Sequence, residues 1–204
     1  MKNNKINIVK SGVGNIGSII RVCKDLEFDF VIIDKPEDFS DTKKIILPGI
    51  GSFDSFMKSI RSKNLFHKIE ELVLKEDYSI LGICVGMQSL FEGSEEGETK
   101  GFGFINYKCK KFKSDIKKVP HIGWNQIKII KNCKLFDEIE SRLFYFAHSY
   151  AYLKQDKNIT LTTTNYINEF SSSVAVGNIY GVQFHPEKSF HQGKQIIKNF
   201  IEKC

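Results

Sequence analysis

The stretch "YSILGICVGMQ", Tyr78–Gln88, places an apolar run directly before a turn bracketed by two glycines. The run is typical of a buried strand, and the residues from Met87 onward of a helix. Gly82 and Gly86 flank Cys84 in the pattern G-x-C-x-G, which matches a nucleophile elbow with sulfur in place of oxygen. Such an elbow lifts a nucleophile above the carboxyl edge of an α/β sheet. The stretch therefore predicts a parallel sheet and a candidate thiol nucleophile.

Apolar and amphipathic segments alternate along the first half of the chain. They predict strands at 6–10, 30–34, 43–49 and 78–84, with helices near 16–23, over 53–75 with a break near Asn64, and over 87–93. This order is typical of a parallel sheet covered by helices on both faces. After Gly97, short apolar segments predict strands at 102–113, 125–130, 143–150, 159–166, 172–178 and 179–185, and a closing helix at 193–202.

The composition limits the possible classes of protein. The 204 residues suffice for one α/β domain, which we expect to span 1–204. No apolar run has the length of a signal peptide's or a membrane span's, so we expect a cytoplasmic protein without membrane contact. Five cysteines without a C-x-x-C pair argue against a disulfide framework or a metal site.

The net charge of +6 comes mostly from lysine, and its densest run is Lys108–Lys118. A nucleic-acid patch, a solvated pair of strands and a protein docking surface all fit such a run. No nucleic-acid-binding motif accompanies it, so we expect no nucleic-acid partner.

A thiol nucleophile needs a base, and the base needs a group that orients it. His185 ends a predicted strand and is followed by Pro186 and Glu187. Residues two apart in an extended segment point the same way, so Glu187 is expected to hold one ring nitrogen while the other faces Cys84. Taken alone, the elbow also fits a small buried cysteine, and "HPE" also fits a strand end with a surface carboxylate. The elbow offers a nucleophile without a base, and "HPE" offers a base and its orienting carboxylate without a nucleophile. Together the two motifs therefore weaken both of these alternatives.

The helix expected after Cys84 also bears on the chemistry. Its N-terminus places partial positive charge near the sulfur, which favours the reactive thiolate. The backbone N–H of Val85 is expected to point at a developing oxyanion. Gln88 lies one helical turn beyond Cys84 and can face the same pocket.

A second motif, "GVGNIG" at Gly12–Gly17, matches G-x-G-x-x-G after a predicted strand. Asp34 follows at the distance expected of a dinucleotide-binding unit, so nucleotide binding is an alternative. The chain offers no second domain for a substrate, and this reading leaves Cys84 and His185 without a purpose. We therefore favour a tight strand-to-helix turn.

Five stretches together carry a family resemblance. "LGICVGMQSLFEGSEEG" at Leu81–Gly97 and "GVQFHPEKS" at Gly181–Ser189 resemble class I, or triad, glutamine amidotransferases, which have a flavodoxin-like fold. "PGIGSF", "PHIGWNQ" and "FAHSY", which start at Pro48, Pro120 and Phe146, resemble the glutaminase subunits of imidazole glycerol phosphate synthase, from histidine biosynthesis.

The resemblance implies a chemistry without metal or cofactor. Cys84 would attack the side-chain amide of glutamine, His185 would transfer protons, and Glu187 would orient His185. The γ-glutamyl thioester would hydrolyse to glutamate and release ammonia. The oxyanion and substrate-binding roles implied by the family fall on Gly49, Gly51, Val85, Gln88, Glu96, His148, Ser149 and Tyr150. The side chains of His121 and His148 are given no proton transfer, and we expect them to be structural or interfacial.

The resemblance also implies a partner, because ammonia is wasted unless something consumes it. The family partner is a (β/α)₈-barrel cyclase subunit that forms a heterodimer and receives ammonia through an internal channel. The implied interface residues are Asn15, Trp124, Asn125 and Lys188, although a buried tryptophan is an alternative for Trp124.

Two other readings remain open. Lys10-Ser11 stands where many family members have Asp-Tyr, near the docking face. This departure keeps open a paralogous glutaminase that supplies ammonia to a sugar amidotransferase for a surface glycan. A catalytically silent regulatory subunit is the other alternative, against which the complete Cys-His-Glu set argues.

Overall fold

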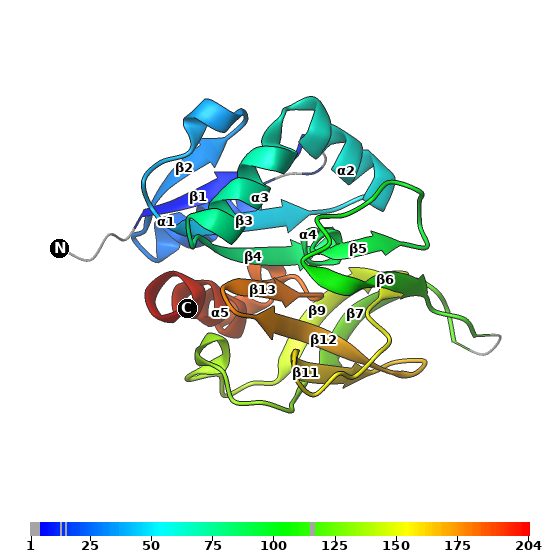
Figure 1. The fold of residues 1–204 in the computed structure, drawn as a ribbon. Coiled ribbons are helices and arrows are strands. Elements are labelled where there is room, and N and C mark those ends of the chain that lie inside the picture. The colour runs from blue at the N-terminus through cyan, green and yellow to red at the C-terminus, as the bar shows by residue number, and fades with distance from the viewer. Residues whose placement is uncertain (1–4, 13, 15, 115–116) are drawn as a thin grey trace.

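The computed structural model describes residues 5–12, 14, 16–114 and 117–204. Its centre is an eight-stranded sheet (Figure 1), whose strands are, in spatial order, β2 (Asp29–Ile33), β1 (Lys5–Val9), β3 (Lys44–Gly49), β4 (Ser79–Cys84), β13 (Ile179–Val182), β12 (Glu169–Val176), β11 (Thr160–Asn165) and β8 (Lys128–Ile129). The first five strands in this order run parallel to one another. The last three, β12, β11 and β8, each pair antiparallel with the strand before them. The predicted mainly parallel sheet with added antiparallel strands is thereby confirmed.

Helices flank this sheet as the alternating pattern predicted. They are α1 (Gly17–Asp25), α2 (Phe53–Ser62), α3 (Leu65–Lys75), α4 (Val85–Ser89) and α5 (Phe190–Lys203), with short 3-10 turns η1 (Pro36–Asp38), η2 (Lys134–Phe136) and η3 (Pro186–Lys188). The break between α2 and α3 falls at Asn64, as predicted, because Asn64 adopts a left-handed conformation with φ 58°. In Figure 1, α2 and α3 lie together beside β3, while α5 lies next to β13.

Two smaller sheets complete the second half. One has the order β10 (Tyr150–Ala151), β6 (Ile105–Lys111) and β5 (Phe91–Ser94), and the other pairs β7 (His121–Gln126) with β9 (Leu143–His148). Strand β9 leads directly to β10 through Ser149, so a single segment connects the two small sheets. This segment later forms one wall of the main pocket.

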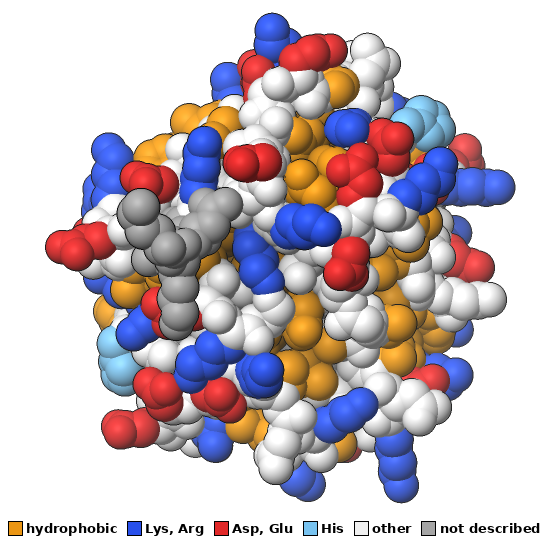
Figure 2. All heavy atoms as spheres, turned by 60° about the vertical axis from the view of Figure 1, so that its left-hand side comes forward, with side chains coloured by type: hydrophobic (Ala, Val, Ile, Leu, Met, Phe, Trp, Pro, Cys, Tyr) orange, Lys and Arg blue, Asp and Glu red, His pale blue; other side chains and the backbone are white. Residues whose placement is uncertain are grey.

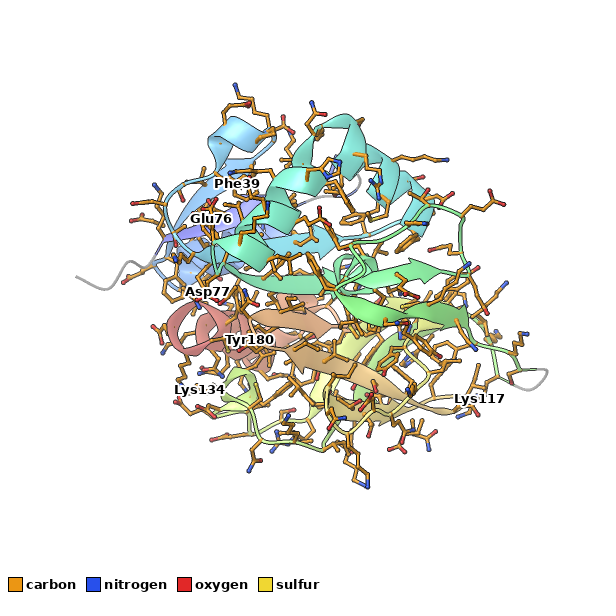
Figure 3. All side chains as sticks on the ribbon, in the orientation of Figure 1. Phe39, Glu76, Asp77, Lys117, Lys134 and Tyr180 are labelled. Atoms are coloured by element: carbon orange, nitrogen blue, oxygen red, sulfur yellow. The ribbon has the colours of Figure 1, made fainter. Side chains whose placement is uncertain are left out.

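The core lies on the central strands, whose side chains are buried on both faces. Strands β3 and β4 read as near-continuous apolar runs because parallel strands are covered on both sides. Helix α5 closes one face, where Phe200 meets Tyr180 of β13 edge to face at 5.9 Å between ring centroids. Tyr180 is labelled beside this helix in Figure 3. A second apolar cluster joins Met87 of α4 to Phe91 and Tyr152.

The helix predicted at 87–93 is partly wrong. Helix α4 ends at Ser89, and Phe91–Ser94 forms β5, parallel to β6. The backbone N–H groups of Gly101 and Phe102 donate to the carbonyls of Glu92 and Ser89, which draws this segment into extended structure. Tertiary hydrogen bonding and burial of Phe91 thus override a sequence that is locally compatible with a helix.

Other predicted boundaries also moved. The strand predicted from 102 begins at Ile105, and β7 begins at His121, ahead of the predicted 125. The strand predicted over 179–185 ends at Val182, so His185 lies beyond the sheet edge.

The basic run alternates along β6 in the manner of a solvated strand. Lys108 and Lys110 are exposed, whereas Cys109 between them is fully buried. Figure 2 shows, on the face turned forward, lysines and arginines interspersed with acidic side chains and no field of one sign. Lys117, at the edge of the molecule away from the N-terminus (Figure 3), lies over the ring of Tyr166. Among the helices of the described residues, none is long and apolar enough to cross a bilayer.

Candidate active site

Cys84 occupies a strained turn between β4 and α4. Its φ of 54° and ψ of −110° are unusual for a residue with a side chain. A Cβ on Gly82 would lie 2.6 Å from the Gly86 carbonyl oxygen, and a Cβ on Gly86 would lie 1.9 Å from the Leu47 carbonyl oxygen. Close backbone packing therefore requires a glycine on each side of Cys84 in the elbow.

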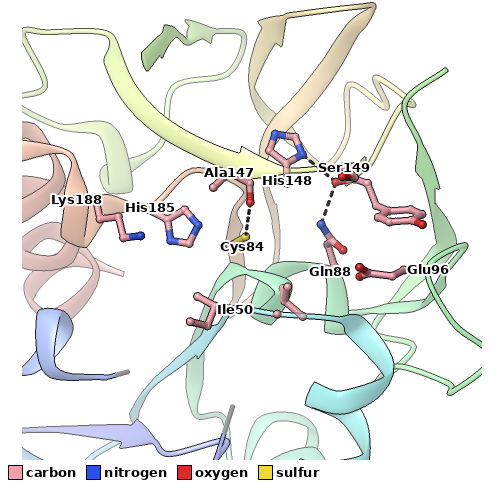
Figure 4. Close-up of a pocket in the computed structure, with 12 residues that line it drawn as sticks. Ile50, Cys84, Gln88, Glu96, Ala147, His148, Ser149, His185 and Lys188 are labelled. Atoms are coloured by element: carbon pink, nitrogen blue, oxygen red, sulfur yellow. Dashed lines mark hydrogen bonds between the residues drawn. The ribbon is translucent and has the colours of Figure 1, made fainter. Parts of the chain in front are cut away.

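A cavity of about 240 Å³ opens above this turn (Figure 4). Its wall comes from the β3–α2 segment, the turn between β4 and α4, the segment after β5, the β9–β10 segment, and His185 and Lys188 at η3. Of the site residues predicted from sequence, it is lined by Gly51, Cys84, Val85, Gln88, Glu96, His148, Ser149, Tyr150, His185 and Lys188. The sequence reasoning missed Ile50 and Ala147, which line the same cavity.

His185 and Glu187 form a buried pair next to Cys84. The Nδ1 of His185 lies 2.8 Å from Oε1 of Glu187, and the two side chains are 2% and 9% exposed. The reason given for this pairing was wrong in detail: Pro186–Lys188 forms a 3-10 turn, and this turn, instead of an extended segment, brings Glu187 back to the ring. Burial alone would lower the pKa of His185, but the neighbouring Cys84 sulfur and the Glu187 carboxylate raise it to about 10.

The sulfur of Cys84 has two polar neighbours besides His185. Its Sγ lies 3.8 Å from the Ala147 carbonyl oxygen, which a thiol S–H can reach. The Nε2 of Gln183 donates to Sγ at 3.7 Å, and Gln183 is fully buried. Gln183 was also missed, although it stands two positions before His185 in the motif "GVQFHPE", where a shared orientation was the available signal.

The far end of the cavity carries acceptor groups. Gln88 donates through Nε2 to the Tyr150 carbonyl oxygen at 2.9 Å, while its own Oε1 is buried and has no partner among the described residues. Glu96 accepts a hydrogen bond from the Phe53 backbone N–H at 2.9 Å. Burial raises the pKa of the Glu96 carboxyl, and the Phe53 hydrogen bond partly offsets this effect.

Gly49 and Gly51 occupy different places. Gly51 has φ 81° and lines the main cavity, whereas Gly49 lines a second cavity of about 20 Å³ on the other side of Ile50. A Cβ on Gly49 would lie 2.4 Å from the Gly86 backbone nitrogen. Gly49 thus lets β3 approach the elbow closely. Glu187 also lines the smaller cavity, and its Oε2 is buried without a partner among the described residues.

The predicted interface residues lie at one end of the β7–β9 pair. Trp124 is 40% exposed, so the alternative of a core tryptophan is not what the structure has, and its ring stacks on Phe190 at 4.8 Å and 9°. Lys188 lies over the Tyr145 ring at 5.6 Å. Asn125 donates to the Asn165 carbonyl oxygen at 3.0 Å. The remaining predicted interface residue, Asn15, lies outside the described residues.

The glycine-rich motif leads into α1 at Gly17, and Gly12 and Gly14 have positive φ values. The Asp34 carboxylate, the expected ribose ligand of a nucleotide site, is instead paired with Lys63 at 2.5 Å and with Lys10 at 3.6 Å. Its pKa is lowered, first by the hydrogen bond from Lys63. This pairing fits the preferred reading of a strand-to-helix turn.

No metal site is apparent in the part of the chain that the structure describes, where no three His, Cys, Asp or Glu side chains are grouped to hold an ion. All five cysteines are free.

Comparisons with known proteins agree with this geometry. The family model "Glutamine amidotransferase class-I" matches residues 7–204. A protein of Methanococcus maripaludis named imidazole glycerol phosphate synthase subunit HisH 2 is 48% identical over 98% of this chain and 100% of its own length. The Leptospira interrogans protein named subunit HisH is 40% identical over 96% of this chain and 98% of its own length.

Solved structures support the fold. The chain superimposes with a TM-score of 0.76 on a structure titled as a glutamine amidotransferase, at 16% identity and covering 97% of both chains. A structure of PurLQS from Thermotoga maritima gives a TM-score of 0.75 at 19% identity, with 98% of each chain covered. The matched family model and the full-length relatives show that this chain belongs to the class I glutamine amidotransferases, in the group of the HisH subunits of imidazole glycerol phosphate synthase.

Proposed function

We propose that the protein is a glutaminase that hydrolyses L-glutamine to glutamate and ammonia with a Cys84-His185-Glu187 triad. The observation that carries the proposal is that Cys84 and His185 line one cavity, with His185 bonded to the buried Glu187 at 2.8 Å. Nucleophile, base and orienting carboxylate in this order are what acyl transfer through a thioester requires.

In the first half-reaction, the Cys84 sulfur attacks the side-chain carbonyl carbon of glutamine. The carbon–nitrogen bond breaks, and the proton held by His185 goes to the leaving ammonia. Water then attacks the γ-glutamyl thioester while His185 takes its proton, which releases glutamate and restores Cys84. Glu187 keeps the imidazole ring oriented and stabilises its charged form.

The acceptor groups at the far end of the cavity suit the amino-acid head of the substrate. An ammonium group carries donors only, and two of the residues that line the cavity here, Gln88 and Glu96, carry acceptor oxygens; Gln88 Oε1 has no other partner among the described residues. The segment from His148 to Tyr150 supplies backbone groups beside them. We assign the oxyanion to the backbone at Val85 and Gly51, with Gly49 placing the strand.

We further propose that residues 1–204 form one glutaminase domain that docks as a heterodimer on a (β/α)₈-barrel cyclase and passes ammonia to it through a channel, for imidazole glycerol phosphate formation. The names of the relatives support this pathway. Exposed aromatic side chains are typical anchors of interfaces, and here Trp124 and Phe190 are 40% and 70% exposed. Asn125, Lys188 and Asn15 complete the proposed docking face.

A second candidate is a paralogous glutaminase that feeds a sugar amidotransferase. Lys10-Ser11 favours it, because the Lys10 ammonium lies 3.6 Å from the Asp34 carboxylate, a contact that an aspartate at position 10 would not make. A docking face altered at that turn suits a different partner.

Glutamate release, measured with the candidate cyclase and its ligand present, tests the chemistry. Rescue of a histidine auxotroph that lacks its glutaminase tests the pathway. We expect rescue; its absence, together with co-purification of a sugar amidotransferase, would favour the second candidate.

A further inference from the structure

Two histidines without a role in the proposed triad form a buried pair behind the glutamine pocket. His121 and His148 are 2% and 6% exposed, and face each other across the β7–β9 pair. His121 Nδ1 lies 3.1 Å from His148 Nε2. His148 Nδ1 lies 2.9 Å from the Tyr150 carbonyl oxygen, and Asn125 Nδ2 lies 3.2 Å from His121 Nε2.

These contacts form a hydrogen-bond chain, and the groups at its two ends fix which atom donates in each bond. A carbonyl oxygen accepts only, so His148 must carry its proton on Nδ1, which leaves its Nε2 as an acceptor. His121 must then donate from Nδ1, and its Nε2 accepts from the amide of Asn125. The chain runs in one direction from Asn125 to Tyr150, with both rings neutral.

A second series of hydrogen bonds, which leads to the nucleophile, meets the first at the Tyr150 carbonyl oxygen, which accepts from both His148 and Gln88. Gln88 Nε2 donates to the Tyr150 carbonyl oxygen at 2.9 Å and to Gln183 Oε1 at 3.1 Å. These two bonds use both protons of the Gln88 amide and fix its orientation, and its buried Oε1 is left without a partner among the described residues. Gln183 Nε2 then donates to the Cys84 sulfur at 3.7 Å. A buried network with every donor assigned in this way holds its members rigidly.

Within this proposed glutaminase, we propose that His121 and His148 are positioning residues for glutamine: their directional hydrogen bonds, which start at Asn125, hold the Tyr150 carbonyl and Gln88 in the orientation that binds the substrate. The outer end of this hydrogen-bond chain is Asn125 on β7, next to Trp124 on the proposed docking face. Its inner end is Tyr150, which lines the cavity. His121 itself does not line the cavity and therefore acts through His148.

The surroundings keep the pair neutral. Burial, together with the charge of Lys117, lowers the pKa of His121 to about 4, and burial, together with the neighbouring His121, lowers that of His148 to about 3. His121 is stacked between Phe146 at 4.8 Å and Tyr166 at 4.0 Å, so its ring cannot turn freely.

The tautomers are measurable without any assumption about activity. Nitrogen NMR of the histidine-labelled full chain at neutral pH distinguishes a proton on Nδ1 from one on Nε2. We expect two rings with the proton on Nδ1, assigned to His121 and His148 by the loss of each signal on substitution. A proton on Nε2 of either ring would overturn the proposal.

A matched pair of variants tests the effect on glutamine. His121→Asn keeps a donor near the position of Nδ1, whereas His121→Leu has a similar shape and no donor. Both lose the ring stacking, so effects on general stability are shared. We expect His121→Leu to raise KM for glutamine about tenfold, the effect of one hydrogen bond of about 1.4 kcal/mol, with kcat less affected, and His121→Asn to restore most of the loss.

Two reagents separate this proposal from the proposed function. Acivicin, a glutamine analogue, requires the pocket, whereas iodoacetamide reports on the Cys84 thiol alone. We expect His121→Leu to slow labelling of Cys84 by acivicin and to leave labelling by iodoacetamide within about twofold, well below one lost hydrogen bond. Equal behaviour of the Leu and Asn variants would overturn the positioning role. A wild-type chain that releases no glutamate and takes up no acivicin would instead contradict the glutaminase.

Discussion

Gln183 Nε2 lies 3.7 Å from the sulfur of Cys84, and both side chains are buried. A donor at this place stabilises the thiolate and leaves the Cys84 side chain in a defined orientation.

Replacing this donor should slow the thiol. Gln183→Met has a similar length and no N–H group, so iodoacetamide should label Cys84 about threefold to tenfold more slowly at neutral pH. Labelling is followed on the Cys84 peptide by mass spectrometry. Gln192→Met removes another buried glutamine, which donates to the Leu143 carbonyl away from the cavity, and serves as the control. Equal rates in wild type and Gln183→Met would refute the role.

The Glu187 carboxylate should matter to turnover more than to binding. Glu187→Gln keeps the size and an acceptor oxygen but removes the charge that stabilises protonated His185. We expect kcat to fall about 100-fold, with KM within about threefold. Steady-state glutamate release measures both constants, and Glu92→Gln, at an exposed position, is the control. An unchanged kcat would show that the carboxylate does not assist His185.

The elbow should tolerate no added methyl group. A Cβ at Gly86 would lie 1.9 Å from the Leu47 carbonyl oxygen, whereas one at Gly93 would meet nothing closer than 3.7 Å. Gly86→Ala should therefore destabilise the protein by at least about 2 kcal/mol or prevent folding, and Gly93→Ala should cost less than about 1 kcal/mol. Urea denaturation compares them. A Gly86→Ala protein as stable as wild type would contradict the close packing of β3 on the elbow.

The buried histidine pair should make the protein less stable in mild acid. The unfolded chain binds a proton to His121 near pH 6.5, while the folded chain does so only near pH 4. Between these values the unfolded state binds more protons, so stability is lost as pH falls. We expect the urea concentration at the midpoint of unfolding to be lower at pH 5 than at pH 7, and the difference to be smaller in His121→Asn. Both pH values lie above the range in which most carboxylates titrate. An equal drop in both proteins would contradict the lowered pKa.

The arrangement of the main sheet was predictable because each strand before residue 85 carries its own apolar signal. The run before Cys84 and the glycines around it also located the candidate nucleophile. The failure at 87–93 has a physical cause: Phe91 is buried by a strand pairing with β6 that no local pattern reports.

The site was predictable where a motif is contiguous and less so where contacts are long-range. His185 and Glu187 were expected together, but the 3-10 turn that joins them depends on packing beyond the strand end. The contact of His121 with His148 joins two histidines 27 positions apart through the register of β7 and β9, and sequence gave no means to pair them.

The most direct test of the central claim traps the covalent intermediate. The protein, turning over glutamine with its partner, is quenched in acid and its peptides are weighed by mass spectrometry. We predict a γ-glutamyl group on the Cys84 peptide, and neither that group nor glutamate release in Cys84→Ala. A γ-glutamyl group on another residue, or undiminished glutamate release by Cys84→Ala, would contradict the account.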